Sequence, residues 1–225
     1  MPVPLDEYPV HQAPLSMRYM ATSDRNCYDR SYLNAHDRSG EIFFVTGLGV
    51  YPNLGVIDAY ATVGRTQRQT TLRFSDALGD DRSLQQVGPY RIEVTEPLER
   101  IRLVCDAGAQ GVSFDMSFTG SFPAVEEPRH LMRQGGRVIL DASRFAQVGT
   151  WSGTLCVDGE ELTLDDDTWV GTRDRSWGIR PVGEAEPPGR SAAEPDEAFG
   201  FWWTYVPLRF EDFAFLIILQ EDGRG

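Results

Sequence analysis

The sequence contains no lysine. All 21 basic residues are arginines, and the 34 acidic residues outnumber them, which gives a formal net charge of −13 at pH 7. A nucleic-acid-binding protein needs a basic face that neutralises phosphates, and here the arginines are interleaved with aspartate and glutamate. The composition therefore argues against a nucleic acid as partner.

Cysteine is scarce and long apolar runs are absent. Cys27, Cys105 and Cys156 are too few and too irregularly spaced for a secreted disulfide framework. The N-terminus has acidic residues and prolines where a signal peptide has a basic start and an apolar run. The longest apolar stretch, residues 213–219, is far shorter than the roughly 20 residues that span a bilayer. We therefore expect a cytoplasmic protein with no membrane span.

Metal and nucleotide motifs are also missing. His11, His36 and His130 lie far apart and have no partner at a ligand spacing, and the acidic run 165–167 lacks the glycine and distal glutamate of a calcium loop. The glycines of residues 47–52 follow a predicted strand, but neither the third glycine of a dinucleotide fingerprint nor an amphipathic helix comes after them. We expect no metal and no other cofactor.

Short apolar and β-branched runs, separated by glycine, proline or Asp-Gly, predict a meander of about a dozen strands. Alternation of apolar and polar residues is clearest in 99–105 and 111–119, and Asp158-Gly159 is typical of a tight hairpin turn. The predicted strands are 41–47, 55–63, 68–75, 90–95, 99–105, 111–119, 136–141, 149–157, 160–164, 168–173, 198–206 and 210–220.

The pattern divides the chain into four parts. We expect an extended arm over 1–26, a barrel domain over 27–180, and an exposed loop or linker over the Pro-, Gly- and Glu-rich residues 181–197. Aromatic strands in 198–225 complete the barrel or start a second one. A short helix is expected within 123–134. The last apolar strand has no return strand behind it and would leave an exposed edge, so we expect a truncated chain.

Residues 169–180 form the densest group of chemically capable side chains, with two tryptophans, one carboxylate and three guanidinium groups. In an extended strand Asp174 projects to one side and its two arginine neighbours project to the other. Burial of Asp174 in an aromatic barrel would raise its pKa toward that of a general acid. The alternative is a structural Asp–Arg network in which Trp177 closes the barrel end and stacks on Arg180.

Residues 199–206 carry aromatic side chains on both faces of a predicted strand. One face can fill a barrel core, and the other can form the wall of a site for an apolar molecule. Besides Asp174 as the catalytic candidate, the candidate ligand-binding residues are Arg175, Trp177, Arg180, Trp202, Trp203 and Tyr205.

Several short motifs resemble the ordered signature of the lipocalin-like superfamily of carotenoid 1,2-hydratases (hydroxyneurosporene synthases) and their actinobacterial-type relatives. The likeness covers roughly residues 28 to 220. The motifs are Gly-Val-Tyr-Pro-Asn-Leu-Gly at 49–55, Arg-Phe-Ala-Gln at 144–147, Gly-Thr-Leu at 153–155, Val-Asp-Gly-Glu at 157–160 and Gly-Thr-Arg-Asp-Arg-Ser-Trp-Gly-Ile-Arg at 171–180.

This resemblance implies an all-β fold with little helix, an antiparallel lipocalin-like β-barrel that is the first of a tandem pair, with a ligand cavity in or between the barrels. The superfamily includes hydratases of isoprenoid double bonds and pericyclases, and both chemistries need no metal. Asp174 matches the acid of a Tyr-x-Asp pattern in the hydratases. The sequence departs from that pattern at Thr172, in place of the tyrosine, and at Ala146, in place of an acid.

The leading hypothesis is therefore a protein that binds a hydrophobic small molecule, isoprenoid or polyketide-like, in an aromatic barrel cavity. Such a protein could catalyse cofactor-free hydration, isomerisation or cyclisation with Asp174 as general acid. The alternative is a non-catalytic carrier or structural domain in which Asp174, Arg175 and Trp177 close the barrel. An acid in the cavity without an arginine partner favours the enzyme, and an acid paired with arginine and facing away favours the carrier. A homodimer remains open.

Overall fold

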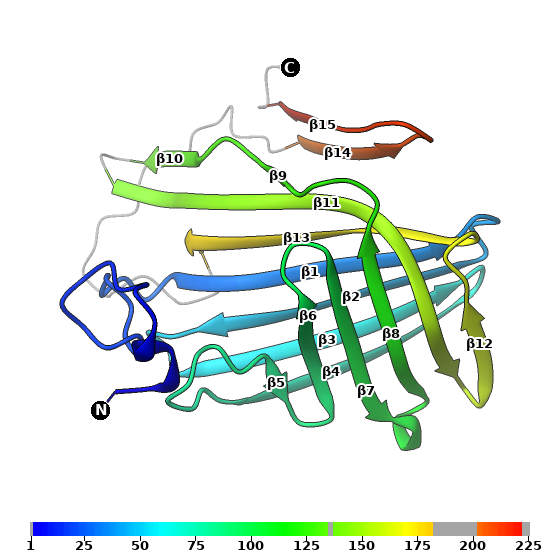
Figure 1. The fold of residues 1–225 in the computed structure, drawn as a ribbon, viewed down its shortest axis with the longest axis horizontal. Helices are drawn as coiled ribbons and strands as arrows, with labels where there is room; N and C mark the ends of the chain where they lie inside the picture. The colour runs from blue at the N-terminus through cyan, green and yellow to red at the C-terminus, as the bar shows by residue number, and fades with distance from the viewer. Residues whose placement is uncertain (1, 135–136, 182–201, 222–225) are drawn as a thin grey trace.

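The computed structural model describes residues 2–134, 137–181 and 202–221. One antiparallel sheet curls into a nearly closed barrel, in the strand order β4-β3-β2-β1-β13-β11-β8-β7-β6-β5, with β9, β10 and β12 paired to β11 (Figure 1). The strands of this sheet are β1 (Cys27–Asp37), β2 (Ile42–Tyr51), β3 (Val56–Arg65), β4 (Arg68–Ala77), β5 (Gln86–Val87), β6 (Tyr90–Glu96), β7 (Arg100–Ala107), β8 (Val112–Gly120), β9 (Val125–Glu126), β10 (His130–Gln134), β11 (Arg137–Val157), β12 (Glu160–Leu164) and β13 (Trp169–Ile179).

The described residues contain little else of regular structure. A hairpin of β14 (Trp202–Arg209) and β15 (Ala214–Glu221) forms a sheet of its own. The helical segments are two short 3₁₀ turns, η1 (Pro4–Glu7) and η2 (Gly108–Gln110), and neither is long and apolar enough to cross a membrane. The predicted all-β, antiparallel barrel with little helix is confirmed.

Three details differ from the sequence prediction. The predicted strands 136–141 and 149–157 belong to one long strand, β11, because the residues between them pair with β13. The prediction of a helix within 123–134 is wrong, because β9 and β10, on either side of Pro128, form backbone hydrogen bonds with β11. Strand β1 lies before the first predicted strand, 41–47. Residues 182–197 of the expected linker lie outside the described residues.

The barrel interior is filled by the alternate residues that the strand patterns predict. In β7, Ile101, Leu103 and Cys105 are buried, and β8 buries every second residue from Val112 to Phe118. Phe118 meets the Trp151 indole edge to face at 5.3 Å between ring centroids, and this indole donates a hydrogen bond of 2.9 Å to the Asn34 carbonyl. Large aromatic side chains therefore tie β8, β11 and β1 together across the core.

One buried polar pair lies among these aromatic residues. The hydroxyls of Tyr90 and Thr46 are hydrogen-bonded at 2.9 Å, and Thr46 also donates to the Tyr60 carbonyl at 2.6 Å. We expect Tyr90→Phe to lower the free energy of unfolding by about 1 kcal/mol, because Thr46 keeps its other partner. Urea unfolding tests this, with the exposed Tyr8→Phe as control. Equal stability of wild type and Tyr90→Phe would contradict the expectation.

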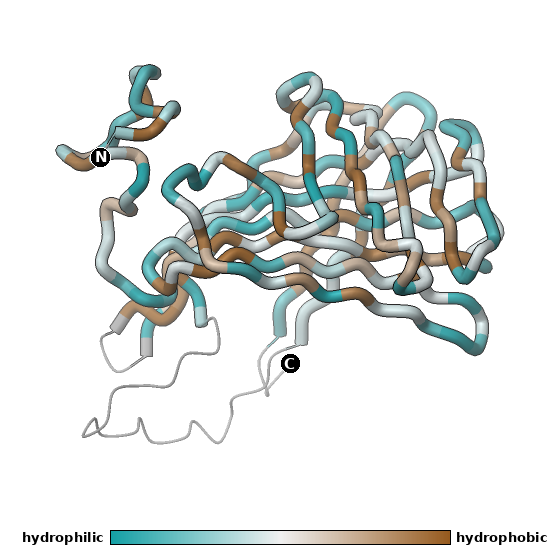
Figure 2. The backbone as a smooth tube through the Cα atoms, turned by 90° about the horizontal axis from the view of Figure 1, so that it is seen from below, coloured by the Kyte–Doolittle hydropathy of each residue, from teal (hydrophilic) through white to brown (hydrophobic). Residues whose placement is uncertain are grey.

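The arm before β1 folds into turns rather than an extended segment, and it lies at one end of the barrel (Figure 2). The Asp6 carboxylate organises it by accepting hydrogen bonds from the backbone N–H groups of Met17 and Val3 and from the Ser16 hydroxyl. These bonds, that of Met17 first, hold the pKa of Asp6 well below its usual range. Arg82 fastens the arm to the barrel by donating to the Met17 carbonyl at 2.6 Å.

Candidate functional site

The two faces of β13 carry different chemistry. Arg173 and Arg175 face the barrel interior, where Arg173 reaches Gln147 of β11. Asp174 lies on the opposite face, as strand alternation predicts. In the sheet register Asp174 stands between Tyr32 of β1 and Ala146 of β11. The expectation that Asp174 points into the barrel is therefore wrong, because the inward positions of β13 are occupied by its arginine neighbours.

Ionisable side chains from five neighbouring segments gather around Asp174 on this outer face. In one row of paired residues across β3, β2, β1 and β13, Tyr60 is followed by Gly47, Tyr32 and Asp174. In the next row on the same face, Asp58 is followed by Gly49, Arg30 and Ser176. Beyond β13, Arg144 of β11 continues the second row. We call the following residues the outer-face cluster: Arg30, Tyr32, Asp58, Tyr60, Glu127, Arg144, Asp174 and Tyr205.

Two glycines of β2 make room for this cluster. A Cβ atom on Gly47 would lie 2.9 Å from Cε1 of Tyr60, and one on Gly49 would lie 2.8 Å from Oδ1 of Asp58. Any larger residue would push these side chains away from β2. Gly47 and Gly49 belong to the segment 47–52 that resembles part of a nucleotide fingerprint. Because they have no side chains, the side chains of Tyr60 and Asp58 can extend over β2 toward β1.

The β14–β15 hairpin covers part of the outer-face cluster. The guanidinium carbon of Arg144 lies 5.1 Å from the Trp203 ring centroid and 5.5 Å from that of Tyr205. Arg144 also pairs with Glu127, with 2.7 Å between Nε and Oε2. Cation–π contacts therefore fasten β14 to the barrel. Two buried polar atoms of the cluster, the Tyr205 hydroxyl and Oε1 of Glu127, have no hydrogen-bond partner among the described residues.

Burial changes the acid–base behaviour of the cluster. It raises the pKa of Asp174 to about 6, an effect that Arg144 opposes and Glu127 increases. Burial likewise raises the pKa of Tyr60 to about 12 and the pKa values of Asp58 and Tyr205 above their usual range. No hydrogen bond or ion pair joins Asp174 to another described residue. Its carboxyl group is thus set to exchange a proton near neutral pH.

The charges beside Asp174 give a prediction with two opposite signs. Arg144→Gln should raise the pKa of Asp174 further, because it removes a cation that favours the carboxylate. Glu127→Gln should lower it, because it removes a like charge. Carboxyl-carbon NMR titration of each variant against wild type measures both changes. Shifts of the same sign in the two variants would contradict this electrostatic description.

A groove adjoins the cluster between the outer face of the sheet and β14. Its volume is about 350 Å³, and its apolar lining includes Phe43, Val148, Val170 and Leu208. Its polar and charged lining residues include Asn34, His36, Arg38 and Arg209. Thr172 lines the groove and lies on the same face of β13 as Asp174, two residues away, or about 7 Å along the strand. Asp174 does not line the groove itself, so a ligand in the groove reaches its carboxyl group only by extending past Thr172.

The six predicted ligand-binding residues do not form one site. Arg175 faces inward at the barrel end, with its Nε 3.0 Å from Asp29, and Trp177 lies near Phe145 with 39% of its surface exposed. Arg180 stacks on Tyr28 rather than on the predicted Trp177. Of the six, Trp203 and Tyr205 lie at the outer-face cluster, and Trp202 is largely exposed. Arg180 is near enough to this cluster for its charge to oppose the raised pKa of Asp174.

Sequence reasoning missed most partners of Asp174. Tyr32, Tyr60, Asp58 and Arg144 come from strands far apart in the chain. The sequence pattern that could have indicated these residues is their alternation with apolar residues. In β3, for example, Asp58 and Tyr60 occupy the positions between buried residues. Among the described residues, no three histidine, cysteine or acidic side chains gather to hold a metal ion.

These features define a lipocalin-like β-barrel with a polar cluster on its outer face. The chain belongs to a family of unknown function (DUF8625), whose model matches residues 3–225. No curated protein sequence matches it.

Solved structures with the same fold come from other proteins. An AttH-like protein from Nitrosomonas europaea is 15% identical, with a TM-score of 0.57, over 80% of this chain and 56% of its own. Kievitone hydratase from Nectria haematococca is 16% identical, with a TM-score of 0.52, over 80% of this chain and 52% of its own. This chain thus spans about half the length of these proteins, and the likeness concerns the fold.

Proposed function

We propose that the protein binds an apolar, isoprenoid- or polyketide-like small molecule in the groove beside β14 and catalyses its cofactor-free hydration, isomerisation or cyclisation, with Asp174 as the general acid. The observation that carries this proposal is the half-buried Asp174 carboxyl group on the outer face, which has a pKa raised to about 6 and no ion pair with a described residue. Acids with a perturbed pKa beside a groove with partly apolar walls are characteristic of functional sites.

The chemistry follows from the surroundings of Asp174. The protonated carboxyl group transfers its proton to one carbon of an alkene, and the π electrons form the new C–H bond. The resulting carbocation is stabilised by the ring face of Trp203 or Tyr205 that is not stacked on Arg144. Water then adds to the cation and returns a proton to the Asp174 carboxylate, which gives hydration. Loss of a neighbouring C–H proton to the same carboxylate gives isomerisation instead.

Two further facts support this assignment. The Tyr205 hydroxyl and Oε1 of Glu127 are buried without described partners, so polar groups of a substrate or water can bind them. Among proteins of this fold, the one from Nectria haematococca is named a hydratase. The proposed site differs from the sequence prediction, because it lies on the outer face of the barrel rather than in its interior.

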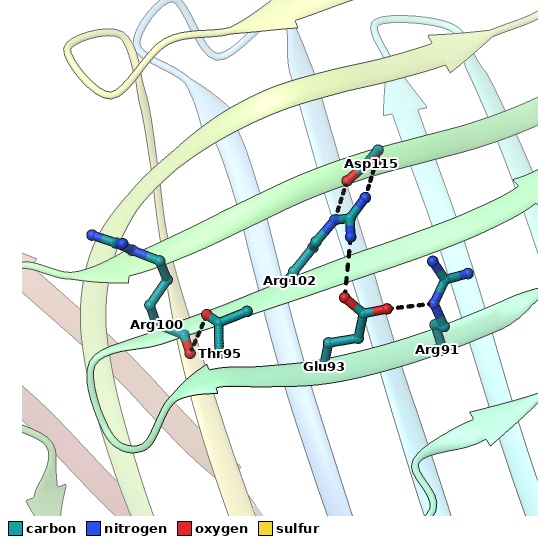
Figure 3. A network of polar contacts seen from close by, with 6 residues as sticks. All are labelled: Arg91, Glu93, Thr95, Arg100, Arg102 and Asp115. Atoms are coloured by element: carbon teal, nitrogen blue, oxygen red, sulfur yellow. Dashed lines mark hydrogen bonds and ion pairs between the residues drawn. The ribbon is translucent and has the colours of Figure 1, made fainter.

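The test compares the compounds that co-purify with the protein from its own host. Native mass spectrometry with organic extraction is applied to wild type, to Asp174→Asn and to the control Asp115→Asn. Asp115 is an acid of β8 that pairs with Arg102 on another part of the barrel surface (Figure 3). We expect one apolar compound with wild type and with Asp115→Asn, and its unreacted precursor with Asp174→Asn.

The same experiment can overturn the proposal. An identical compound in all three proteins would identify a carrier, in which Asp174 has no chemical role. Circular dichroism of Asp174→Asn shows whether the barrel still folds, and an unfolded variant would mean that Asp174 is structural.

A further inference from the structure

The barrel interior contains a cation that the outer-face site does not use. Arg173 is 6% exposed, and its guanidinium carbon lies 5.4 Å from the Phe118 ring centroid and 5.8 Å from that of Phe145. Its Nε donates a hydrogen bond of 2.8 Å to Oε1 of Gln147. Gln147 is held in turn, because its amide nitrogen donates to the carbonyls of Leu98 and Phe122 at 2.9 and 2.7 Å. Neutral groups thus fix the orientation of the Arg173 guanidinium.

The charge of Arg173 has no counter-ion among the described residues. Nη2 of Arg173 is buried and has no hydrogen-bond partner there. The neighbouring Arg175 differs, because Asp29 lies 3.0 Å from its Nε. Burial, with a contribution from Arg175, lowers the pKa of Arg173 to about 10. An unpaired buried cation is unfavourable, and an anion placed against it would offset that cost.

A cavity with apolar walls adjoins this cation. Its volume is about 180 Å³, and its apolar lining includes Leu33, Ile92, Ile101 and Phe145. Its polar and charged lining residues are Ser31, Gln85, Arg173, Asp174 and Arg175. Drug-sized ligands occupy pockets of roughly 300–1,000 Å³. The cavity therefore suits a small molecule with one anionic end and a short hydrocarbon body. Inorganic anions would leave its apolar walls unused.

We propose that this cavity is a second ligand site, which binds a short-chain carboxylic acid. The carboxylate pairs with the free edge of the Arg173 guanidinium, and the hydrocarbon chain packs against Leu33, Ile92 and Ile101. Asp174 also borders the cavity, but its side chain projects to the face of β13 opposite that of Arg173, so the proposed carboxylate partner is Arg173 and not a residue of the outer-face cluster. The second site therefore does not depend on the function proposed for Asp174.

Hexanoate and 1-hexanol test this proposal, because they share a hydrocarbon chain and differ in charge. Isothermal titration calorimetry is carried out on wild type, Arg173→Gln and the matched control Arg102→Gln. Arg102 lies on the barrel surface, where Asp115 and Glu93 already pair with it (Figure 3). We expect wild type and Arg102→Gln to bind hexanoate at least tenfold more tightly than 1-hexanol, and Arg173→Gln to lose this preference.

Two results would overturn the proposal. One is equal affinity of wild type for hexanoate and 1-hexanol, a comparison that needs no variant. The other is unchanged hexanoate binding by Arg173→Gln or, if that variant does not fold, by Arg173→Met, which keeps an unbranched side chain that can pack against Phe118 and Phe145 and removes the charge.

Arg144→Gln separates this site from the outer-face cluster, because Arg144 is a cation of that cluster and does not line the cavity. We expect this variant to bind hexanoate as wild type does. Loss of hexanoate binding in Arg144→Gln would place the acid in the outer-face cluster and contradict the interior site.

Discussion

Gly171→Ala is expected to lower the free energy of unfolding by at least about 3 kcal/mol. A Cβ atom at this position would lie 2.0 Å from the Asn34 carbonyl oxygen and 2.7 Å from Nε1 of Trp151. These two atoms form the hydrogen bond that joins β11 to β1. The added methyl group must therefore separate two paired strands or break a buried hydrogen bond. Such a loss is a large fraction of the stability of a typical domain.

Gly64→Ala provides the matched control for this prediction. Gly64 also lies within a strand, β3, but an added Cβ would be 3.7 Å from its nearest neighbour, which is ordinary contact. We expect a change of about 0.5 kcal/mol or less from this variant. Urea unfolding followed by circular dichroism measures both variants. Similar stabilities for Gly64→Ala and Gly171→Ala would contradict the close packing of Gly171 against the Asn34 carbonyl and the Trp151 indole.

Asp174→Asn is expected to stabilise the protein at neutral pH and not at acidic pH. The pKa of Asp174 rises from 3.8 in the unfolded chain to about 6 in the folded protein. The folded state therefore holds more protons than the unfolded state between these values, so the stability of wild type falls as pH rises through this interval. Asparagine cannot ionise. Its advantage over aspartate should thus grow from pH 4 and level off above pH 6, at on the order of 2–3 kcal/mol.

Asp115→Asn should change stability in the opposite direction. A hydrogen bond from Arg102 holds the pKa of Asp115 below its usual value, so its carboxylate stabilises the folded state above that pKa. Urea unfolding at several pH values between 4 and 8 compares the two variants with wild type. A loss of stability in Asp174→Asn at pH 7 would mean that the Asp174 carboxylate is stabilised by partners rather than opposed by burial.

Much of the fold could be predicted from local sequence, because β7 and β8 alternate apolar and polar residues with little interruption. The Asp158-Gly159 turn was predictable for the same reason. Both residues adopt positive φ, 53° and 86°, and the turn connects β11 to β12. Strand β1 is harder to recognise, because its residues Asp29 to Tyr32 are mostly polar on both faces.

The site was only partly predictable. Asp174 stands out because residues 169–180 combine several reactive side chains, and alternation alone separates it from Arg173 and Arg175. Which of the two faces is the barrel interior depends on how β13 pairs with β1 and β11, and these partners lie far away in the sequence. The covering of the outer face by β14 is a tertiary contact of the same kind, and no local pattern specifies it.

Titration of the Asp174 carboxyl carbon by NMR in the wild-type protein tests the central claim most directly. The signal is assigned by its absence from the spectrum of Asp174→Asn. We expect a midpoint near pH 6, since burial on the outer face disfavours the carboxylate. A midpoint at or below pH 4 would contradict this account, because Asp174 would then be ionised throughout the neutral range and could not act as the proposed acid.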